Sequence, residues 1–164
     1  MPQYLSRQMF EHLSRYALSM LMRERRLHHL ASTSTNTPQM IGLRFGTVIG
    51  ISTVQRTDLF AVALARASAE SGYMRVILPL SVRPVLHLND LERAVRAIMA
   101  TPGQARRFDI FNVASFHSTI SRFSNELASL SGKRGFEVPR NQQNENSFAV
   151  NCTYFAKNIF FQVP

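Results

Sequence analysis

Residues 83–98 read RPVLHLNDLERAVRAI, and along this stretch the pattern changes from that of a strand to that of a helix. The apolar run 85–88 is typical of a short extended segment. It is followed by residues 89–92, which are of the capping-box type, and then by apolar residues that recur on one helical face. A strand that leads directly into an amphipathic helix is the repeating element of an α/β fold.

The same alternation continues on both sides of this stretch. Helices are predicted over residues 16–30, 59–71, 89–101 and 118–130, and strands over 40–45, 74–79, 85–88 and 108–113. Thr57 and Asp58 are expected to cap the second helix, and Ser118 or Thr119 the fourth. The polar stretches 31–38 and 133–146 are expected to be loops. This alternation predicts an α/β protein with a partly parallel sheet.

Length and charge narrow the class of protein. The chain has 164 residues, of which 45% are hydrophobic, and this is enough for one compact domain with a core. The formal net charge of +9 is carried by 17 arginines and only 2 lysines. Either an anionic partner or a bias in nucleotide composition explains this skew. Because the arginines and the aromatic residues are dispersed, a nucleic-acid partner is not expected.

The sequence lacks several motifs that would indicate a membrane span, a phosphate-binding loop or a metal site. No apolar run reaches the roughly 18–20 residues of a membrane span, so none is expected and a cytoplasmic location is predicted. The sequence contains no G-x-G-x-x-G loop and no P-loop, the glycine-rich segments that cradle phosphates. Cys152 is the single cysteine, and the pair His28 and His29 lacks neighbouring ligands, so no metal site is predicted.

Four segments occur in an order and at spacings that resemble one enzyme family. They are residues 43–50 (LRFGTVIG), 83–91 (RPVLHLNDL), 111–115 (FNVAS) and 160–164 (FFQVP). Together they resemble the extended short-chain dehydrogenases/reductases, the NAD-dependent epimerase/dehydratase family. In that family the first segment follows the active-site helix, and the second matches an Arg-x-(apolar)-x-His-Val-x-Asp segment that precedes a helix.

The resemblance implies a partial Rossmann-like α/β fold, the C-terminal half of an extended short-chain dehydrogenase with its small substrate-binding lobe. It implies a single truncated domain over residues 1–164. Residues 16–50 would hold the active-site helix and the following strand, and residues 51–164 the substrate-binding region. The family uses NAD or NADP, but the glycine-rich loop that holds the cofactor is missing here, so this chain alone is not expected to bind it.

The resemblance also assigns site residues. The family's Tyr-x-x-x-Lys pair matches Tyr16, the proton donor, and Met20, which replaces the lysine; Tyr4 and Gln8 form a second frame farther upstream. A lysine one turn from the tyrosine lowers the pKa of the phenol, and a methionine cannot do this. The remaining expected site residues are Phe45 and Thr47 at the nicotinamide, and Arg83 and His87 at the substrate, where Arg83 would bind the diphosphate. Each of these side chains also has a purely structural explanation, as a packing or surface residue.

Three classes of function remain open. The first is an NAD-dependent epimerase/dehydratase-like enzyme, with Tyr16-mediated proton transfer and hydride transfer to NAD(P) on a nucleotide-sugar-type substrate, truncated and weak or inactive alone. The second is a catalytically dead pseudoenzyme that serves as a structural or interaction subunit and contacts an anionic partner. The third is a binding module for nucleotide sugars without chemistry. A protein partner or a second copy is expected to complete the sheet, because half a fold leaves a strand edge unpaired.

Overall fold

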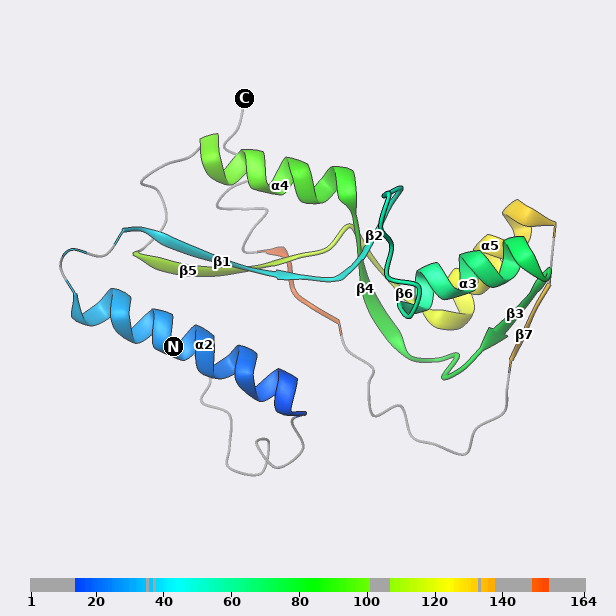
Figure 1. The fold of residues 1–164 in the computed structure, drawn as a ribbon, viewed down its shortest axis with the longest axis horizontal. Helices are drawn as coiled ribbons and strands as arrows, with labels where there is room; N and C mark the ends of the chain where they lie inside the picture. Colours follow the sequence, from blue (N-terminus) through cyan, green and yellow to red (C-terminus); the bar gives the residue numbers. More distant parts are fainter. Residues whose placement is uncertain are drawn as a thin grey trace. The chain divides into compact units, whose positions relative to one another are not determined.

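The computed structural model describes residues 14–34, 36, 38–100, 107–132, 134–137 and 149–153 (Figure 1). The chain divides into two compact units. The first unit consists of Met1–Gly42 and Gly103–Ile110, and the second of Leu43–Pro102 and Phe111–Pro164. Strands β1 and β5 pass from one unit into the other.

The first unit contains a long helix, α2, which spans Arg15–Thr33. It begins where the Ser14 hydroxyl accepts a hydrogen bond from the backbone N–H of Ala17 at 3.1 Å, which satisfies one of the free donors of the first turn. Ala31 is the buried residue of this helix. The rest of α2 is half-buried on one side and exposed on the other, as expected for a helix that covers a sheet.

Strands β1, Met40–Phe45, and β5, Phe108–Val113, form a two-stranded pair. In the first unit the backbone N–H of Met40 donates a hydrogen bond to the carbonyl of Arg107 at 2.8 Å. Both strands coincide with the strands that the sequence predicts at 40–45 and 108–113. The match follows from their apolar composition, which is typical of buried strands.

The second unit contains a three-stranded sheet in the order β2-β4-β6. These strands are β2, Thr47–Ile49, β4, Val82–His87, and β6, Phe116–Thr119. β4 is the central strand; it runs parallel to β2 and antiparallel to β6. The predicted α/β class with a partly parallel sheet is therefore confirmed.

Two helices of the second unit pack over a separate pair of strands (Figure 1). The helices are α3, Phe60–Glu70, and α5, Ile120–Ser131, and the strands are β3, Tyr73–Val76, and β7, Arg134–Glu137, which pair in parallel. Their shared core consists of Leu64, Met74, Val76 and Ile120, with Phe60 and Phe123 packed against it. Burial of these side chains stabilises the unit by roughly 1.5–3 kcal/mol for each large residue.

Helix α4, Leu88–Ala100, follows β4 without an intervening loop. Its buried residues are Ala94 and Ala97, three positions apart on one face. Small side chains there allow the helix to lie close to its neighbours. The strand-to-helix change that the sequence predicts at residues 85–98 is therefore present.

The start and end of α5 also agree with the sequence. The Thr119 hydroxyl accepts a hydrogen bond from the backbone N–H of Arg122 at 3.1 Å, so Thr119, one of the two predicted caps, is the N-cap. Gly132 follows the helix with φ of +68°, a left-handed conformation that ends helices and favours glycine.

Three strands were not predicted. β2 and β6 have three and four residues, which is too short for an alternation pattern to stand out. β7 lies inside the polar stretch 133–146, which the sequence predicts as a loop, so that prediction was wrong for Arg134–Glu137. These segments become strands because a neighbouring strand offers its backbone groups, not because of their own propensity.

Two predicted helix caps were also wrong. The N-cap of α3 is Leu59, which makes no side-chain capping bond, and Asp58 instead forms an ion pair with Arg56 at 2.6 Å. α4 already begins at Leu88, so Asn89 is the second residue of the helix and not its cap. In the first case a local partner, Arg56, takes the polar side chain that the pattern assigned to the helix end.

α2 runs to Thr33, so the loop predicted over 31–38 begins later than expected. Within the described ranges, no helix is long and apolar enough to cross a membrane. The predictions for Tyr4, Gln8 and residues 160–164 fall outside the described residues.

Candidate functional site

Three of the predicted site residues lie on one face of the β2-β4-β6 sheet. Side chains alternate between the two faces along a strand, so Arg83 and His87 of β4 share a face with Val85 between them. The parallel register aligns Thr47 with Val85, and this places Thr47 on the same face. On the other side of β4, Ser118 lies opposite Arg83. We call this surface the Arg83 face.

Arg83 lies in a partly desolvated environment. Its neighbours on the face, Val85 and Ser118, have exposures of 0% and 6%. Burial lowers the pKa of the Arg83 guanidinium, which nevertheless stays charged at neutral pH. A hydrogen bond from a partly buried guanidinium to an anion is stronger than the same bond in water, because less solvent competes for it.

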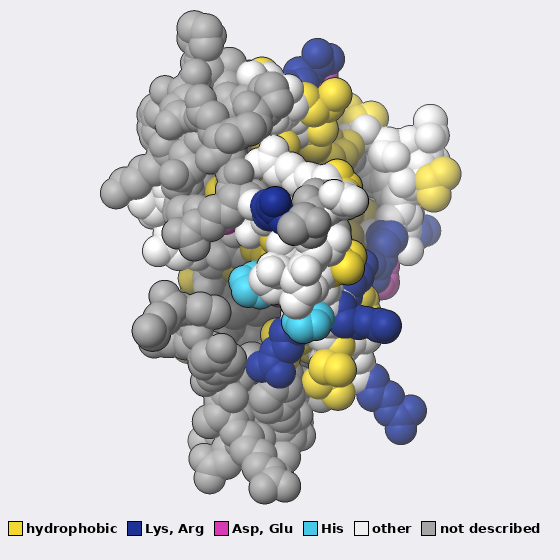
Figure 2. Space-filling view, turned by 90° about the vertical axis from the view of Figure 1, so that its left-hand side faces the viewer, with side chains coloured by type: hydrophobic (Ala, Val, Ile, Leu, Met, Phe, Trp, Pro, Cys, Tyr) yellow, Lys and Arg dark blue, Asp and Glu magenta, His cyan; other side chains and the backbone are white. Residues whose placement is uncertain are grey.

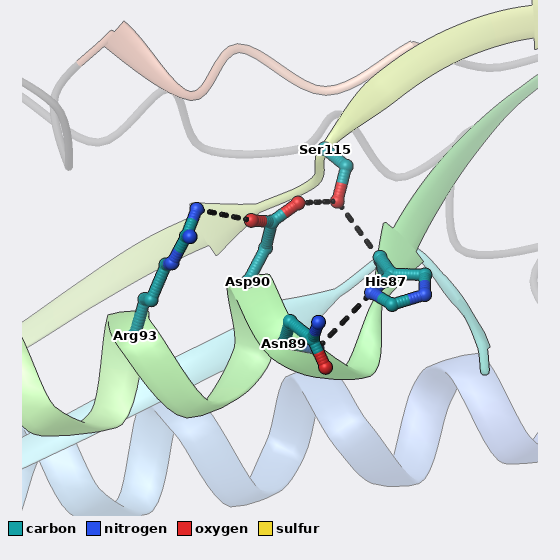
Figure 3. Close-up of polar contacts among 5 residues, drawn as sticks. All are labelled: His87, Asn89, Asp90, Arg93 and Ser115. Carbon is teal, nitrogen blue, oxygen red and sulfur yellow. Dashed lines mark hydrogen bonds and ion pairs between the residues drawn. The ribbon is translucent and has the colours of Figure 1, made fainter. Parts of the chain in front are cut away.

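His87 ends β4 and is held through its backbone and its ring (Figure 3). Its backbone N–H donates to the hydroxyl of Ser115 at 2.8 Å. Its ring nitrogen Nδ1 accepts a hydrogen bond from the backbone N–H of Asn89 at 3.2 Å. A neutral imidazole with Nδ1 as acceptor carries its proton on Nε2, so the remaining ring nitrogen is a donor.

Ser115 links the end of β5 to the start of α4. Its hydroxyl donates to Oδ2 of Asp90 at 2.5 Å while it accepts from the backbone of His87, and its own N–H donates to the carbonyl of Val85 at 2.7 Å. The other carboxylate oxygen of Asp90 pairs with Arg93 at 3.5 Å (Figure 3). The sequence indicated residues 111–115 and Asp90 as parts of separate motifs, and only the fold reveals that they form one network.

Phe45 and Thr47 flank the turn that joins β1 to β2. Gly46, between them, lies so close to β4 that a Cβ atom there would be 2.9 Å from both the carbonyl carbon and the oxygen of Pro84. Only glycine fits at this distance, and it fixes where the two neighbouring residues stand. Phe45 keeps 47% of its surface exposed, whereas Thr47 is half-buried.

Tyr16 and Met20 lie one turn apart on α2, in the first unit. Tyr16 is 74% exposed, which is the environment of a surface tyrosine. Met20 is half-buried, and its sulfur accepts a hydrogen bond from Nη2 of Arg23 at 3.2 Å. In the predicted match to Tyr-x-x-x-Lys, a neutral thioether would therefore stand where the family has its lysine.

A cavity of about 390 Å³ lies in the second unit between α3, α5 and the loop after β2. The Gln55 amide crosses the loop and donates to the carbonyl of Gly50 at 2.7 Å. The lining is mostly apolar, and it consists of Ile49, Gly50, Gln55, Thr57, Ala61, Val62, Ala65, Arg66, Phe123 and Leu127. Arg66 in this lining is paired with Glu70 at 2.7 Å.

The described part of the chain contains no group of three or more His, Cys, Asp or Glu side chains that could hold a metal ion. Cys152 is half-buried, and burial raises the pKa of its thiol. A thiol with a raised pKa is a poor nucleophile at neutral pH, which agrees with the absence of a predicted role.

The fold is similar to that of several solved enzymes. It matches the dTDP-glucose 4,6-dehydratase of Bacillus anthracis in complex with NAD, with a TM-score of 0.71 and 16% identity over 89% of this chain. It also matches the UDP-glucuronic acid 4-epimerase of Bacillus cereus in complex with UDP-glucuronic acid and NAD, with a TM-score of 0.73 and 18% identity over 91% of this chain. A third match is MoeE5 in complex with UDP-glucuronic acid and NAD, with a TM-score of 0.73 and 21% identity over 90% of this chain.

The chain thus has a partial Rossmann-like α/β fold similar to that of these three solved structures, as the sequence predicted. It spans about half the length of the structures that it matches, 46%, 47% and 50% of the three chains. No protein-family model and no curated protein sequence matches the chain.

The similar structures contain NAD, so NAD(P) is the cofactor that the resemblance indicates. The residues of this chain do not by themselves fit such a cofactor. The sequence has no glycine-rich loop for the pyrophosphate, and the Met20 thioether offers no charge or donor to a ribose.

Proposed function

We propose that this chain is the substrate-binding part of an NAD-dependent epimerase/dehydratase-like protein, and that its Arg83 face binds the diphosphate of a nucleotide sugar. The observation that carries the proposal is the placement of Thr47, Arg83 and His87 on one face of the sheet. The fold similarity supports it, because two of the similar proteins were solved with UDP-glucuronic acid.

Arg83 is the residue that binds the diphosphate in this proposal. Its planar guanidinium matches two phosphate oxygens at once, which an ammonium group does not. Partial burial strengthens the contact, and the pairing of Arg83 with Ser118 of β6 fixes its backbone within the sheet. A flexible surface arginine would first have to lose side-chain entropy.

His87 and Thr47 would orient the ligand next to Arg83. With Nδ1 of His87 already accepting from Asn89, its Nε2–H is the group that can donate to an oxygen of the ligand. The Thr47 hydroxyl can both donate and accept, so it suits a sugar or phosphate oxygen. Phe45, beside the same turn, offers an exposed ring for the apolar part of a ligand.

The structure of the Tyr16 site favours weak or no turnover. Tyr16 is 74% exposed, and Met20, one turn away on α2, has a neutral thioether where a lysine would place a charge beside the phenol. The chain therefore has the means to bind a substrate but not to activate its proton donor. This favours a binding role over catalysis by the chain alone.

The proposal is tested by calorimetric titration of the purified chain with UDP-glucuronic acid. We expect Arg83→Gln to weaken binding by about 10-fold or more, the usual effect of removing a charge-assisted hydrogen bond. The matched control is Arg75→Gln, which removes an exposed arginine of β3 and should change the affinity less than about twofold. Equal affinities for the two variants, or no binding by the parent chain, would contradict the proposal.

A second candidate function is a pseudoenzyme that acts as an interaction subunit, and Met20 is the observation that favours it. The discriminating variant is Met20→Lys, assayed for NAD binding and for hydride transfer with a nucleotide sugar. A chain whose turnover rises in this variant has a working cofactor site and is a weakened enzyme. If parent and variant both lack turnover and NAD binding, the pseudoenzyme is favoured.

A further inference from the structure

Residues 149–153 lie against the connection from β5 to β6, in the second unit (Figure 1). We call residues 149–153 the strap and residues 112–117 the β5–β6 connection. The connection carries Ser115, which bonds to Asp90 and His87, and also His117 of β6. We propose that the strap is held on this connection by a neutral His117 and is released when acid protonates the imidazole. The inference does not depend on the proposed nucleotide-sugar site.

Two side chains of the β5–β6 connection bond to the backbone of the strap. The backbone N–H of Val150 donates to Nε2 of His117 at 3.0 Å. The side-chain amide of Asn112 donates to the carbonyl of Asn151 at 3.1 Å. Both bonds join segments that are more than 30 residues apart in the sequence, so they form only when the strap is docked on the connection.

A third contact covers the single thiol of the chain. The Ala114 backbone forms a hydrogen bond with the Cys152 thiol. Cys152 is half-buried, and burial raises the pKa of this thiol. Because Cys152 belongs to the strap, the accessibility of its thiol reports whether the strap is docked.

The contact between His117 and Val150 requires a neutral imidazole. A neutral ring accepts a hydrogen bond at one nitrogen, whereas in the protonated ring both nitrogens are donors. Protonation would therefore place an N–H of the ring against the N–H of Val150. His117 is exposed, so solvent protons reach its ring, and imidazole is the ordinary side chain that changes charge between pH 8 and pH 5. Since the docked state contains the unprotonated ring, docking is favoured at pH 8 and weakens as the pH falls.

The titratable and charged side chains of β4 lie on the opposite side of the sheet from His117. β4 pairs with β6 so that Pro84 lies opposite His117, and residues that lie opposite each other share one face. Arg83 and His87 stand on the other face of β4, because side chains alternate along a strand. Neither of these two groups therefore faces the His117 ring.

The other described segments that contact β6 are α5 and the strap. In α5, Arg122 and Glu126 are exposed and pair with each other at 2.9 Å. Carboxylates and guanidinium groups ordinarily keep their charges between pH 5 and pH 8. In the strap, the raised pKa of Cys152 keeps its thiol neutral over this range. Among these segments, His117 is therefore the group whose change of charge can release the strap.

The first test is an NMR titration of the isotope-labelled chain from pH 8 to pH 5. We expect the backbone signals of Val150 and its strap neighbours to move together with the ring signals of His117, while the signals of the core residue Val76 stay in place. In His117→Gln the side-chain carbonyl is an acceptor that takes up no proton, so the strap signals should also stay in place.

The matched control is His29→Gln, which removes an exposed histidine of α2 in the first unit. Figure 2, which looks toward the end of α2 and the start of β1, shows histidine side chains at the surface. This variant should show the same pH response of the strap as the parent chain. Circular dichroism verifies that each variant is folded.

The second test measures how fast Cys152 reacts with an uncharged thiol reagent at pH 8. His117→Ala removes the acceptor at every pH, so we expect docking to weaken and the reaction to become about 5-fold faster, the usual effect of losing one hydrogen bond. His117→Gln should react within about twofold of the parent chain. Asn112→Ala removes a different bond to the strap and should also raise the rate, while the pH response through His117 remains.

Four results would overturn the proposal. They are strap signals that do not follow the His117 ring, an unchanged pH response in His117→Gln, loss of the response in His29→Gln, and equal reaction rates of Cys152 in the parent chain and in His117→Ala. Movement of the Val76 signals together with those of the strap would also contradict it, because acid would then unfold the whole unit.

Discussion

The hydroxyl of Ser115 is the most informative group to remove, because it connects three elements of the second unit. In Ser115→Ala the backbone N–H of His87 loses its acceptor at 2.8 Å, and Asp90 loses a donor at 2.5 Å. The Cβ atom and the backbone bond from residue 115 to Val85 remain. The change therefore removes two hydrogen bonds and leaves the packing in place.

The expected loss of stability follows from these two bonds. A neutral hydrogen bond contributes about 0.5–1.5 kcal/mol and one to a carboxylate about 1.5–3 kcal/mol. The Asp90 side chain is 40% exposed, so water replaces part of the lost bond and the lower values apply. We expect unfolding to become easier by about 2 kcal/mol, which for a chain of this length lowers the melting temperature by roughly 4–8 °C.

Urea unfolding of the parent chain and its variants measures this loss. The matched control is Ser129→Ala, whose hydroxyl donates only within α5 to the carbonyl of Asn125, and it should cost less than about 0.5 kcal/mol. A double-mutant cycle between Ser115→Ala and Asp90→Ala should give a coupling above about 0.5 kcal/mol. Equal stabilities of the two serine variants would refute the reasoning, as would a coupling of zero.

Three further predictions rest on single residues. Gly46→Ala should lower the free energy of unfolding in urea by about 1–3 kcal/mol, because the new Cβ atom would clash with the Pro84 backbone. The control Gly42→Ala should cost less, because a Cβ atom there would lie 3.5 Å from Cγ1 of Ile110, an ordinary contact distance. Cys152 should react with a thiol reagent more slowly at pH 8 than free cysteine does, because burial raises the pKa of its thiol. The hydrogen bond from Arg56 lowers the pKa of the Asp58 carboxyl. The ion pair between these two side chains therefore stabilises the fold above about pH 4, and this stabilisation is lost as the pH falls further and Asp58 takes up a proton. The melting temperatures of the parent chain and of Asp58→Asn should differ at pH 7 and converge in acid.

Long elements with a strong local pattern could be predicted from the sequence. β1 and β5 are largely apolar segments. α5 has the Thr119 cap at its start and Gly132 after its end, so the local sequence marks both of its boundaries. The elements that were missed are short. β2, β6 and β7 exist because neighbouring strands pair with them, and this information is not contained in three or four residues.

The residues of the candidate site also fall into two groups, those that the sequence indicated and those that only the structure revealed. Arg83 and His87 were indicated because they lie in one motif, and the alternation of a strand is enough to place them on the same face. Ser115 was not indicated as a partner of Asp90, because 25 residues separate them along the chain. The exposure of Tyr16 also came from the structure, since a helix pattern does not reveal which side will be covered.

By itself, the sequence determined the fold class and the order of the main elements, and it predicted that Met20 stands where the family has its lysine. These properties depend on residue type and local spacing, which a linear pattern contains. The tertiary structure alone decided that Thr47 stands beside β4, that Ser115 joins Asp90 to His87, and that Tyr16 is exposed. Each of these depends on strand register or on burial between segments distant in sequence, and such contacts form only when the chain folds.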